Sequence, residues 1–359
     1  MPYTNIDDPS AHFQIALYAG TGSELVITNN GNSNLQPDFL WIKSRTEADA
    51  NHHAHNTNVA TTRTLFVNKT DYEESQTQSV KSVQSNGFTL GTWAGNNKVS
   101  NNFVAWQWKA NGGTTASNTS GSITSTVQVN TDAGFSIVNY TGNGTVGNSS
   151  TTIGHGLSQR PDAIIIKDRD SLSNWSLWHT YFGTNQIQFL NQRFAIATDN
   201  DVWANTLPTS SVFCVGNSAV NTNNNNYVAY CFHNVQGYSK FDSYVGNGNV
   251  NGPFIYTGFK PAYFIVKDTG SSGSSWRILD GTRNPFNSTD LLLALQEVNG
   301  GAEVDGSSHA SNIGVDFVSN GIKITTAYPQ YNASGRTYIY MAFAENPFVT
   351  STGVPTTAR

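Results

Sequence analysis

The chain has 359 residues, of which 12% are charged and 12% are aromatic, and its formal net charge is −5. Soluble proteins carry about 25% charged residues, so neutral polar side chains must keep this chain in solution. The aromatic content argues against a disordered chain, and the lack of a basic run argues against nucleic acid or a membrane surface as a partner.

The beginning of the chain predicts where the protein is made. Residues 1–8 have neither the basic start nor the apolar core of a secretory signal, and no apolar run approaches the roughly 20 residues that span a bilayer. We therefore expect synthesis in a cytoplasm, where disulfides are rare. Cys214 and Cys231 are accordingly expected to be free thiols, on the less buried faces of their strands.

Two strand patterns each occur three times in the same order. The first begins with proline and ends with lysine, at 37–43, 161–167 and 261–267. The second is rich in aromatic residues, at 103–108, 227–232 and 338–343. Triplication at this spacing predicts three domains, which we call repeat 1 (1–116), repeat 2 (117–237) and repeat 3 (238–348), followed by a tail at 349–359.

Within each repeat the patterns predict short antiparallel strands. A Tyr-x-Gly-x-Gly motif, suited to a tight turn with positive φ, stands first, at 18–22, 140–144 and 244–248. The proline-led strand follows and is apolar on both faces, so we expect it to be buried on both sides. Further strands are predicted at 65–67, 88–90 and their counterparts, and helix is nearly absent. The predicted fold is all-β, with three tandem antiparallel β-sandwich modules of jelly-roll-like form.

These motifs resemble a repeat family found in structural proteins of tailed phages, especially marine and cyanobacterial ones. Repeat 2 carries the resemblance best, through Gly134–Gly144, Gly154–Leu157, the strand from Pro161 to Lys167, and Asn226–Phe232. The resemblance implies a virion component on the particle exterior, assembled in the host cytoplasm. A tail fibre, adaptor or attachment component is favoured over a capsid decoration protein. A carbohydrate-binding module for host surface glycans is the other alternative.

The resemblance also implies which partners to expect. They are other phage structural proteins of the capsid, neck or tail, and the chain is expected to form a homo-oligomer, with a trimer as one option. The family supplies no catalytic residues or cofactor. The sequence itself also argues against catalysis. A nuclease-like Asp and Lys pattern is interrupted by Ile165 and Ala262, and no Gly-x-Ser-x-Gly elbow occurs. We therefore expect no enzyme activity and no cofactor.

Four residues are candidate contact or ligand positions. In a strand, His53 and His55 would share one face, where imidazoles can bind a transition metal, particularly on a symmetry axis; a solvated polar strand or loop is the alternative. His155 stands in a Gly-His-Gly-Leu turn and could contact a partner or bond its own loop. Trp203 has no counterpart in the other repeats and is the candidate exposed ring for a glycan or partner, whereas Trp175 and Trp276 recur and are expected in the core.

Overall fold

The computed structural model describes residues 2–296, 302–306 and 313–356. All pairs of named strands are antiparallel, which confirms the predicted all-β class. Helix in the described part is limited to the single turns α1 (Ala94–Asn97), α2 (Ser218–Asn221) and α3 (Pro329–Asn332) and to the 3-10 turn η1 (Pro9–Ala11). Among these residues no helix is long and apolar enough to cross a membrane.

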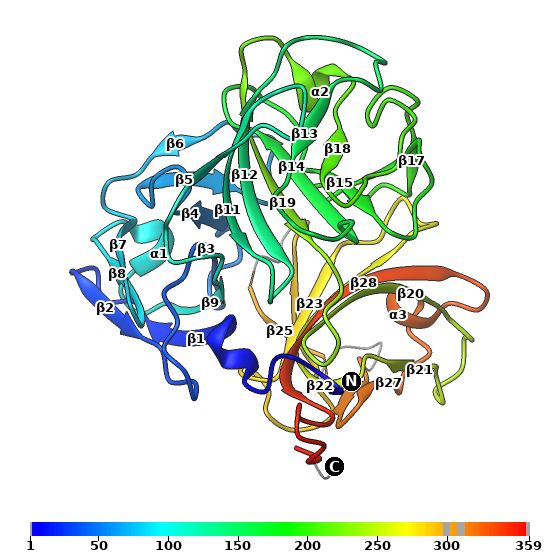
Figure 1. The fold of residues 1–359 in the computed structure, drawn as a ribbon. Coiled ribbons are helices and arrows are strands. Elements are labelled where there is room, and N and C mark those ends of the chain that lie inside the picture. The colour runs from blue at the N-terminus through cyan, green and yellow to red at the C-terminus, as the bar shows by residue number, and fades with distance from the viewer. Residues whose placement is uncertain (1, 297–301, 307–312, 357–359) are drawn as a thin grey trace.

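Three large sheets are built from three successive stretches of chain (Figure 1). The first has the order β1 (Phe13–Ala19), β9 (Asn102–Trp108), β3 (Phe39–Ser44), β4 (His52–Asn56), β5 (Arg63–Phe66) and β6 (Glu74–Ser75). The second has the order β10 (Ala116–Asn118), β11 (Ser125–Asn130), β12 (Phe135–Thr141), β19 (Asn226–Phe232), β14 (Ala163–Asp168), β15 (Ser176–His179), β16 (Gln186–Phe189) and β17 (Ala197–Thr198). The third has the order β20 (Ser239–Val245), β28 (Thr337–Pro347), β22 (Phe259–Asp268), β23 (Arg277–Asp280), β24 (Leu291–Ala294) and β25 (Val304–Asp305).

A smaller sheet accompanies each large one. These sheets are β2 (Leu25–Thr28), β8 (Gly87–Leu90) and β7 (Val80–Gln84); β13 (Thr152–Gly154) with β18 (Val212–Cys214); and β21 (Phe254–Tyr256), β27 (Gly321–Ile324) and β26 (Val315–Val318). In repeat 1, Leu40 and Ile42 of β3 pack with Phe88 of β8 in one buried cluster. Repeat 3 has a corresponding cluster between its two sheets. Each of these cores therefore lies between a large and a small sheet.

The glycine motif explains how each repeat begins. The second glycine has positive φ in all three copies, at Gly22 (68°), Gly144 (73°) and Gly248 (69°), as predicted. The first glycine allows close approach of the backbone: a Cβ at Gly20 would lie 2.1 Å from the carbonyl oxygen of Lys98. The motif's tyrosine donates its hydroxyl to the one-turn helix, from Tyr18 to Asn96 O at 2.9 Å, with equivalent bonds at Tyr140 and Tyr244.

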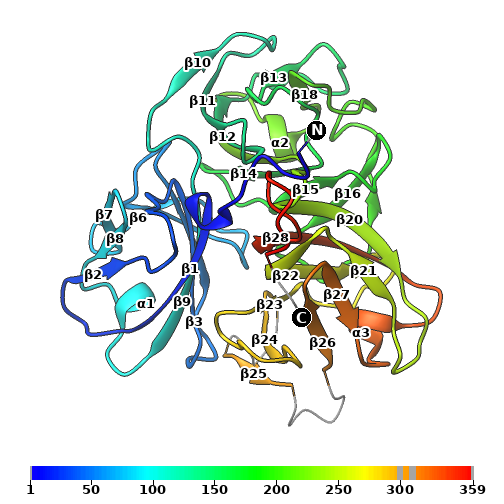
Figure 2. The same ribbon diagram turned by 60° about the horizontal axis from the view of Figure 1, so that its bottom comes forward.

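The proline-led strands are buried on both faces, which confirms the prediction. In β3, Leu40 and Ile42 face the small sheet, while Phe39 and Trp41 belong to a second, larger cluster. That cluster takes residues from all three repeats, and Phe39 lies 4.3 Å from Tyr230 between ring centroids. The three large sheets therefore share one apolar centre, around which the lobes are arranged (Figure 2).

Two short strands extend the large sheets at their edges. β6 begins at Glu74, where the chain pairs with β5. The Gly-, Thr- and Ser-rich segment 112–121 contains β10, which pairs with β11 of the second large sheet.

Candidate functional site

The junctions between repeats follow one backbone pattern. The residue just before the last strand of each large sheet donates its N–H to the residue that follows the proline-led strand of another repeat. These bonds are Glu73 N to Arg169 O (2.8 Å), Ile196 N to Thr269 O (2.9 Å) and Glu303 N to Arg45 O (2.7 Å). They run from repeat 1 to 2, from 2 to 3 and from 3 to 1. The three repeats therefore form a closed ring.

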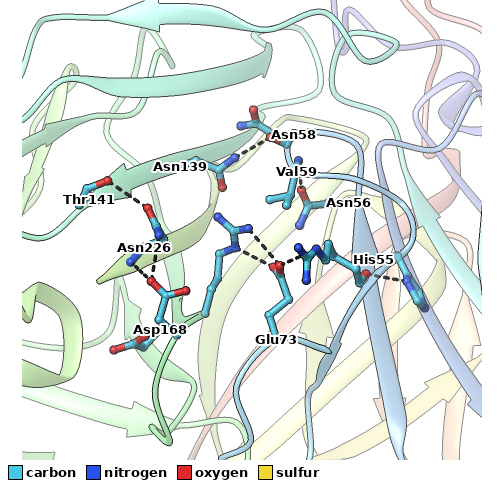
Figure 3. A network of polar contacts seen from close by, with 12 residues as sticks. His55, Asn56, Asn58, Val59, Glu73, Asn139, Thr141, Asp168 and Asn226 are labelled. Atoms are coloured by element: carbon cyan, nitrogen blue, oxygen red, sulfur yellow. Dashed lines mark hydrogen bonds and ion pairs between the residues drawn. The ribbon is translucent and has the colours of Figure 1, made fainter. Parts of the chain in front are cut away.

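An ion pair reinforces the junction of repeats 1 and 2 (Figure 3). The Arg169 guanidinium donates to both carboxylate oxygens of Glu73, at 2.7 and 3.1 Å, and Arg63 lies 3.6 Å from the same carboxylate. Close by, Asn139 donates to the Asn58 carbonyl at 2.7 Å. Only 8% of the Glu73 side chain and 17% of the Arg169 side chain are exposed, so water screens this pair less than it screens an ordinary surface salt bridge.

The junction of repeats 3 and 1 is the most highly charged of the three. Arg45 donates to both carboxylate oxygens of Glu303, at 3.0 and 2.7 Å. Arg283 bridges Glu303 and Asp280, at 3.1 and 2.5 Å, and its side chain is fully buried. The indole of Trp106 donates to the other side of this network, at 3.0 Å from Asp280 Oδ2. Every buried charge here has a partner, as burial in a medium of low polarity requires.

A second feature is repeated around the ring. Trp175 donates its indole N–H to Phe66 O at 2.9 Å, and Trp276 donates to Phe189 O at 3.0 Å, each across a junction. Both rings are buried, which confirms that they belong to the core. His52 stands at this position in repeat 1, and burial holds its pKa well below the usual value.

The repeated lysines are all buried beside backbone carbonyl oxygens. Lys167 donates to Thr70 O at 3.0 Å and to Ser173 O at 2.7 Å, so it too joins repeats 1 and 2. Lys43 has one long contact, 3.5 Å to Glu47 O. Burial lowers the pKa of Lys43 to about 7 and that of Lys167 to about 8. The ammonium group of Lys43 has weaker hydrogen bonding than that of Lys167, which agrees with its lower pKa.

The predicted histidine pair lies in β4 but not at a surface. His53 and His55 are 2% and 1% exposed, so the expectation of a solvated polar segment is wrong. Asn96 of α1 bonds both rings, at 2.7 Å to His53 Nδ1 and 3.1 Å to His55 Nε2, which shows that they share a face. Burial lowers the pKa of His53 to about 3 and of His55 to about 4. Within the described ranges no three His, Cys, Asp or Glu side chains gather as metal ligands.

The other predicted contact residues are buried too. Trp203 is 2% exposed and donates to Gln186 O at 3.0 Å, so its predicted exposure is wrong: the loop after β17 folds the ring onto β16. His155 is 0% exposed and accepts the Leu157 N–H at 3.1 Å, which makes it part of its own turn. Cys214 and Cys231 are free thiols, as expected, but both are buried. The predicted less buried faces are wrong, since Cys231 belongs to the central apolar cluster and the Cys214 thiol lies 3.4 Å from Ser149 O of a neighbouring loop.

Two of the surface hollows formed by the described residues are places where a ligand could bind. One, of about 290 Å³, is lined by Glu47, Asp49, His53, Phe66, Trp93 and Lys98, among others. The other, of about 350 Å³, lies beside the exposed ring of Phe286. In the second hollow, the Asn287 side chain already bonds both backbone groups of Phe317, and Asn284 bonds Ser288 and Asp290. Sequence patterns indicated neither hollow, although His53 was singled out.

Comparison with known proteins gives a family but no described relative. The chain matches DUF7483, a domain of unknown function, over residues 8–347. No curated protein matches the chain, and neither does any solved structure.

Proposed function

We propose that this chain, which belongs to the DUF7483 family, is a structural protein on the exterior of a phage particle, serving as a tail fibre, adaptor or attachment component. We also interpret its repeats as three β-sandwich modules of jelly-roll-like form, at 1–116, 117–237 and 238–348. A capsid decoration protein is the alternative within the same class. The motifs that resemble phage repeat proteins are the basis for placing the chain on a virion.

The closed ring is the observation that carries the structural role. Backbone bonds join the repeats in sequence and back to the start, and the rings of Phe39, Tyr230 and Tyr263 meet in one apolar centre. The apolar centre itself is filled, because the cavity that remains in it measures about 30 Å³ and is too small to enclose a substrate. A rigid body of this kind is suited to docking on a larger assembly with its loops facing outward.

Localisation on purified particles tests the proposal. Antibodies against the chain, viewed by electron microscopy, should label the tail or its attachment point, and mass spectrometry should give a fixed copy number per particle. Label confined to the head would replace the tail assignment with the decoration alternative. Absence of the chain from intact, infectious particles would overturn the virion assignment.

A further inference from the structure

The hollow at the end of β4 is open to solvent and has a buried polar floor. Its volume is about 290 Å³, near the lower end of the roughly 300 to 1,000 Å³ typical of small-molecule sites. Glu47, Asp49 and Lys98 stand at its rim, while Phe66 and Trp93 form the apolar part of its wall. His53, which is 2% exposed, forms part of the floor.

One nitrogen of His53 is available to a ligand. Asn96 donates from Nδ2 to His55 and to Ser79, so its Oδ1 is the atom that accepts from His53 Nδ1, at 2.7 Å. A neutral imidazole that donates from Nδ1 has its lone pair on Nε2. Among the described residues His53 Nε2 has no hydrogen-bond partner, yet it is not sealed from solvent. The floor of the hollow therefore offers a fixed acceptor.

Trp93 supplies the complementary donor. Its ring is held in place between His53, 4.6 Å away between centroids, and Gly95, where a Cβ would lie 2.5 Å from the indole. No residue in the described part of the chain accepts a hydrogen bond from Trp93 Nε1, and this atom is not buried. The hollow is thus lined by one residue with an acceptor and one with a donor that have no partner among the described residues, beside apolar ring surface.

Repeat 3 shows why repeat 1 is hollow at this place. Arg277 of β23 stands where β4 has His53, and its guanidinium lies 5.5 Å from the ring centre of Tyr328, the counterpart of Trp93. Gln330, at the position of Gly95, bonds Arg277. Repeat 1 replaces these two long side chains by an imidazole and a glycine, which leaves the space open.

The charges around the hollow favour a neutral ligand over an ion. Glu47 is paired with Lys98, which donates to it at 2.5 Å, while Lys69, 5.6 Å from the centre of the Phe66 ring, lies 3.6 Å from Asp71. Lys43 is buried behind the rim, 3.5 Å from Glu47 O. A cation would meet these lysines and an anion would meet Asp49. Hydroxyl groups, by contrast, both donate and accept, and so match the mixed set of partners.

We propose that the hollow between β4 and α1 in repeat 1 binds a neutral sugar, with hydroxyls on His53 Nε2 and Trp93 Nε1 and the apolar ring face against Phe66 and Trp93. The site is independent of the virion assignment, since it belongs to the isolated chain. A sugar of this size held by few contacts is expected to bind weakly, with a dissociation constant of roughly 1 mM.

Ligand-observed NMR with the purified full chain tests the proposal. The probes are the methyl glycosides of glucose, galactose and mannose, and N-acetylglucosamine, with L-arginine as the charged comparison. Saturable binding of at least one sugar is expected. Ala94→Arg, on the exposed start of α1 at the wall of the hollow, should weaken it about 10-fold or more by filling the space.

The matched control is Ser218→Arg, at the same exposed position of α2 in repeat 2, which should leave sugar binding unchanged. Asp49→Ala, an exposed rim change that leaves the core intact, should weaken binding by a smaller factor. Thermal unfolding of each variant checks that the fold is retained. Binding of arginine but of no sugar, absence of binding to every probe, or equal binding by Ala94→Arg would each overturn the proposal.

Discussion

Among the described residues, the junction between repeats 2 and 3 differs from the other two in having no ion pair at its repeated backbone bond; there the Arg193 side chain crosses to a backbone carbonyl, Gln296 O, at 2.7 Å. Ile196 and Thr269 stand there, whereas Glu73 with Arg169 and Glu303 with Arg45 stand at the corresponding bonds. The backbone geometry is common to all three, so it does not depend on charge. The charged side chains add strength at two of the junctions, and in both the glutamate belongs to the donating residue and the arginine to the accepting one.

Breaking the most charged junction should have the largest effect. Asp280→Asn keeps the shape of the side chain but leaves the buried Arg283 without its carboxylate at 2.5 Å. Removing one partner of a buried pair costs about 3–5 kcal/mol of the free energy of unfolding. Urea unfolding measures this loss. A loss below about 1 kcal/mol would show that Glu303 alone satisfies Arg283.

The junction of repeats 2 and 3 should depend more on its indole. Trp276→Phe removes the donor to Phe189 O, which keeps only a long bond from Gln192 N at 3.4 Å, at a cost of about 1–2 kcal/mol in the free energy of unfolding. Trp175→Phe makes the same change at the junction that also has the Glu73 and Arg169 pair. We expect the first variant to lose more. A larger loss in Trp175→Phe would contradict the expectation that the ion pair makes the junction of repeats 1 and 2 depend less on its indole.

Low pH should destabilise repeat 1 more than the other repeats, because His52 stands where they have tryptophan. Its pKa is lowered in the folded state, mainly by burial, so below pH of about 6.5 the unfolded chain binds a proton that the folded chain excludes. Stability is therefore lost as pH falls, by up to about 1.4 kcal/mol per pH unit for this residue. His53 and His55 act in the same direction.

The variant His52→Phe isolates this contribution. Its free energy of unfolding should depend less steeply on pH between about 6.5 and 5 than that of the original chain. The slope is the readout, because Trp41 loses its hydrogen bond to His52 Nδ1 at every pH and lowers stability by a constant amount. An unchanged slope would mean that His52 is protonated in the folded protein.

The smallest effect is expected from neutralising the charged junction of repeats 1 and 2. Glu73→Gln retains a hydrogen-bonding side chain opposite Arg169 and should cost about 1 kcal/mol of unfolding free energy. Sodium chloride should reduce this difference, because salt screens the original ion pair. Ile196→Val, an apolar change at the corresponding backbone bond of repeats 2 and 3, serves as control, and its effect should show no salt dependence. A difference that salt leaves unchanged would assign the loss to packing.

The strands and turns were predictable because their signals are local. The positive φ at Gly22 and the burial of β3 on both faces follow from residues next to one another in the chain. Burial of His53 was not predictable in this way, because its partner Asn96 lies 43 residues away and belongs to no motif. The ring contacts left no signal either: Glu73 and Ile196 make the same backbone bond with unrelated side chains.

Because the junctions close on themselves, no repeat stands at an end. In an open stack of repeats the terminal units have one neighbour, fray first and need special capping sequences. Here the bond from Glu303 N to Arg45 O gives repeats 1 and 3 a second neighbour. Loss of any repeat would open two junctions and expose the apolar centre, so the three repeats should unfold in one cooperative transition instead of one after another.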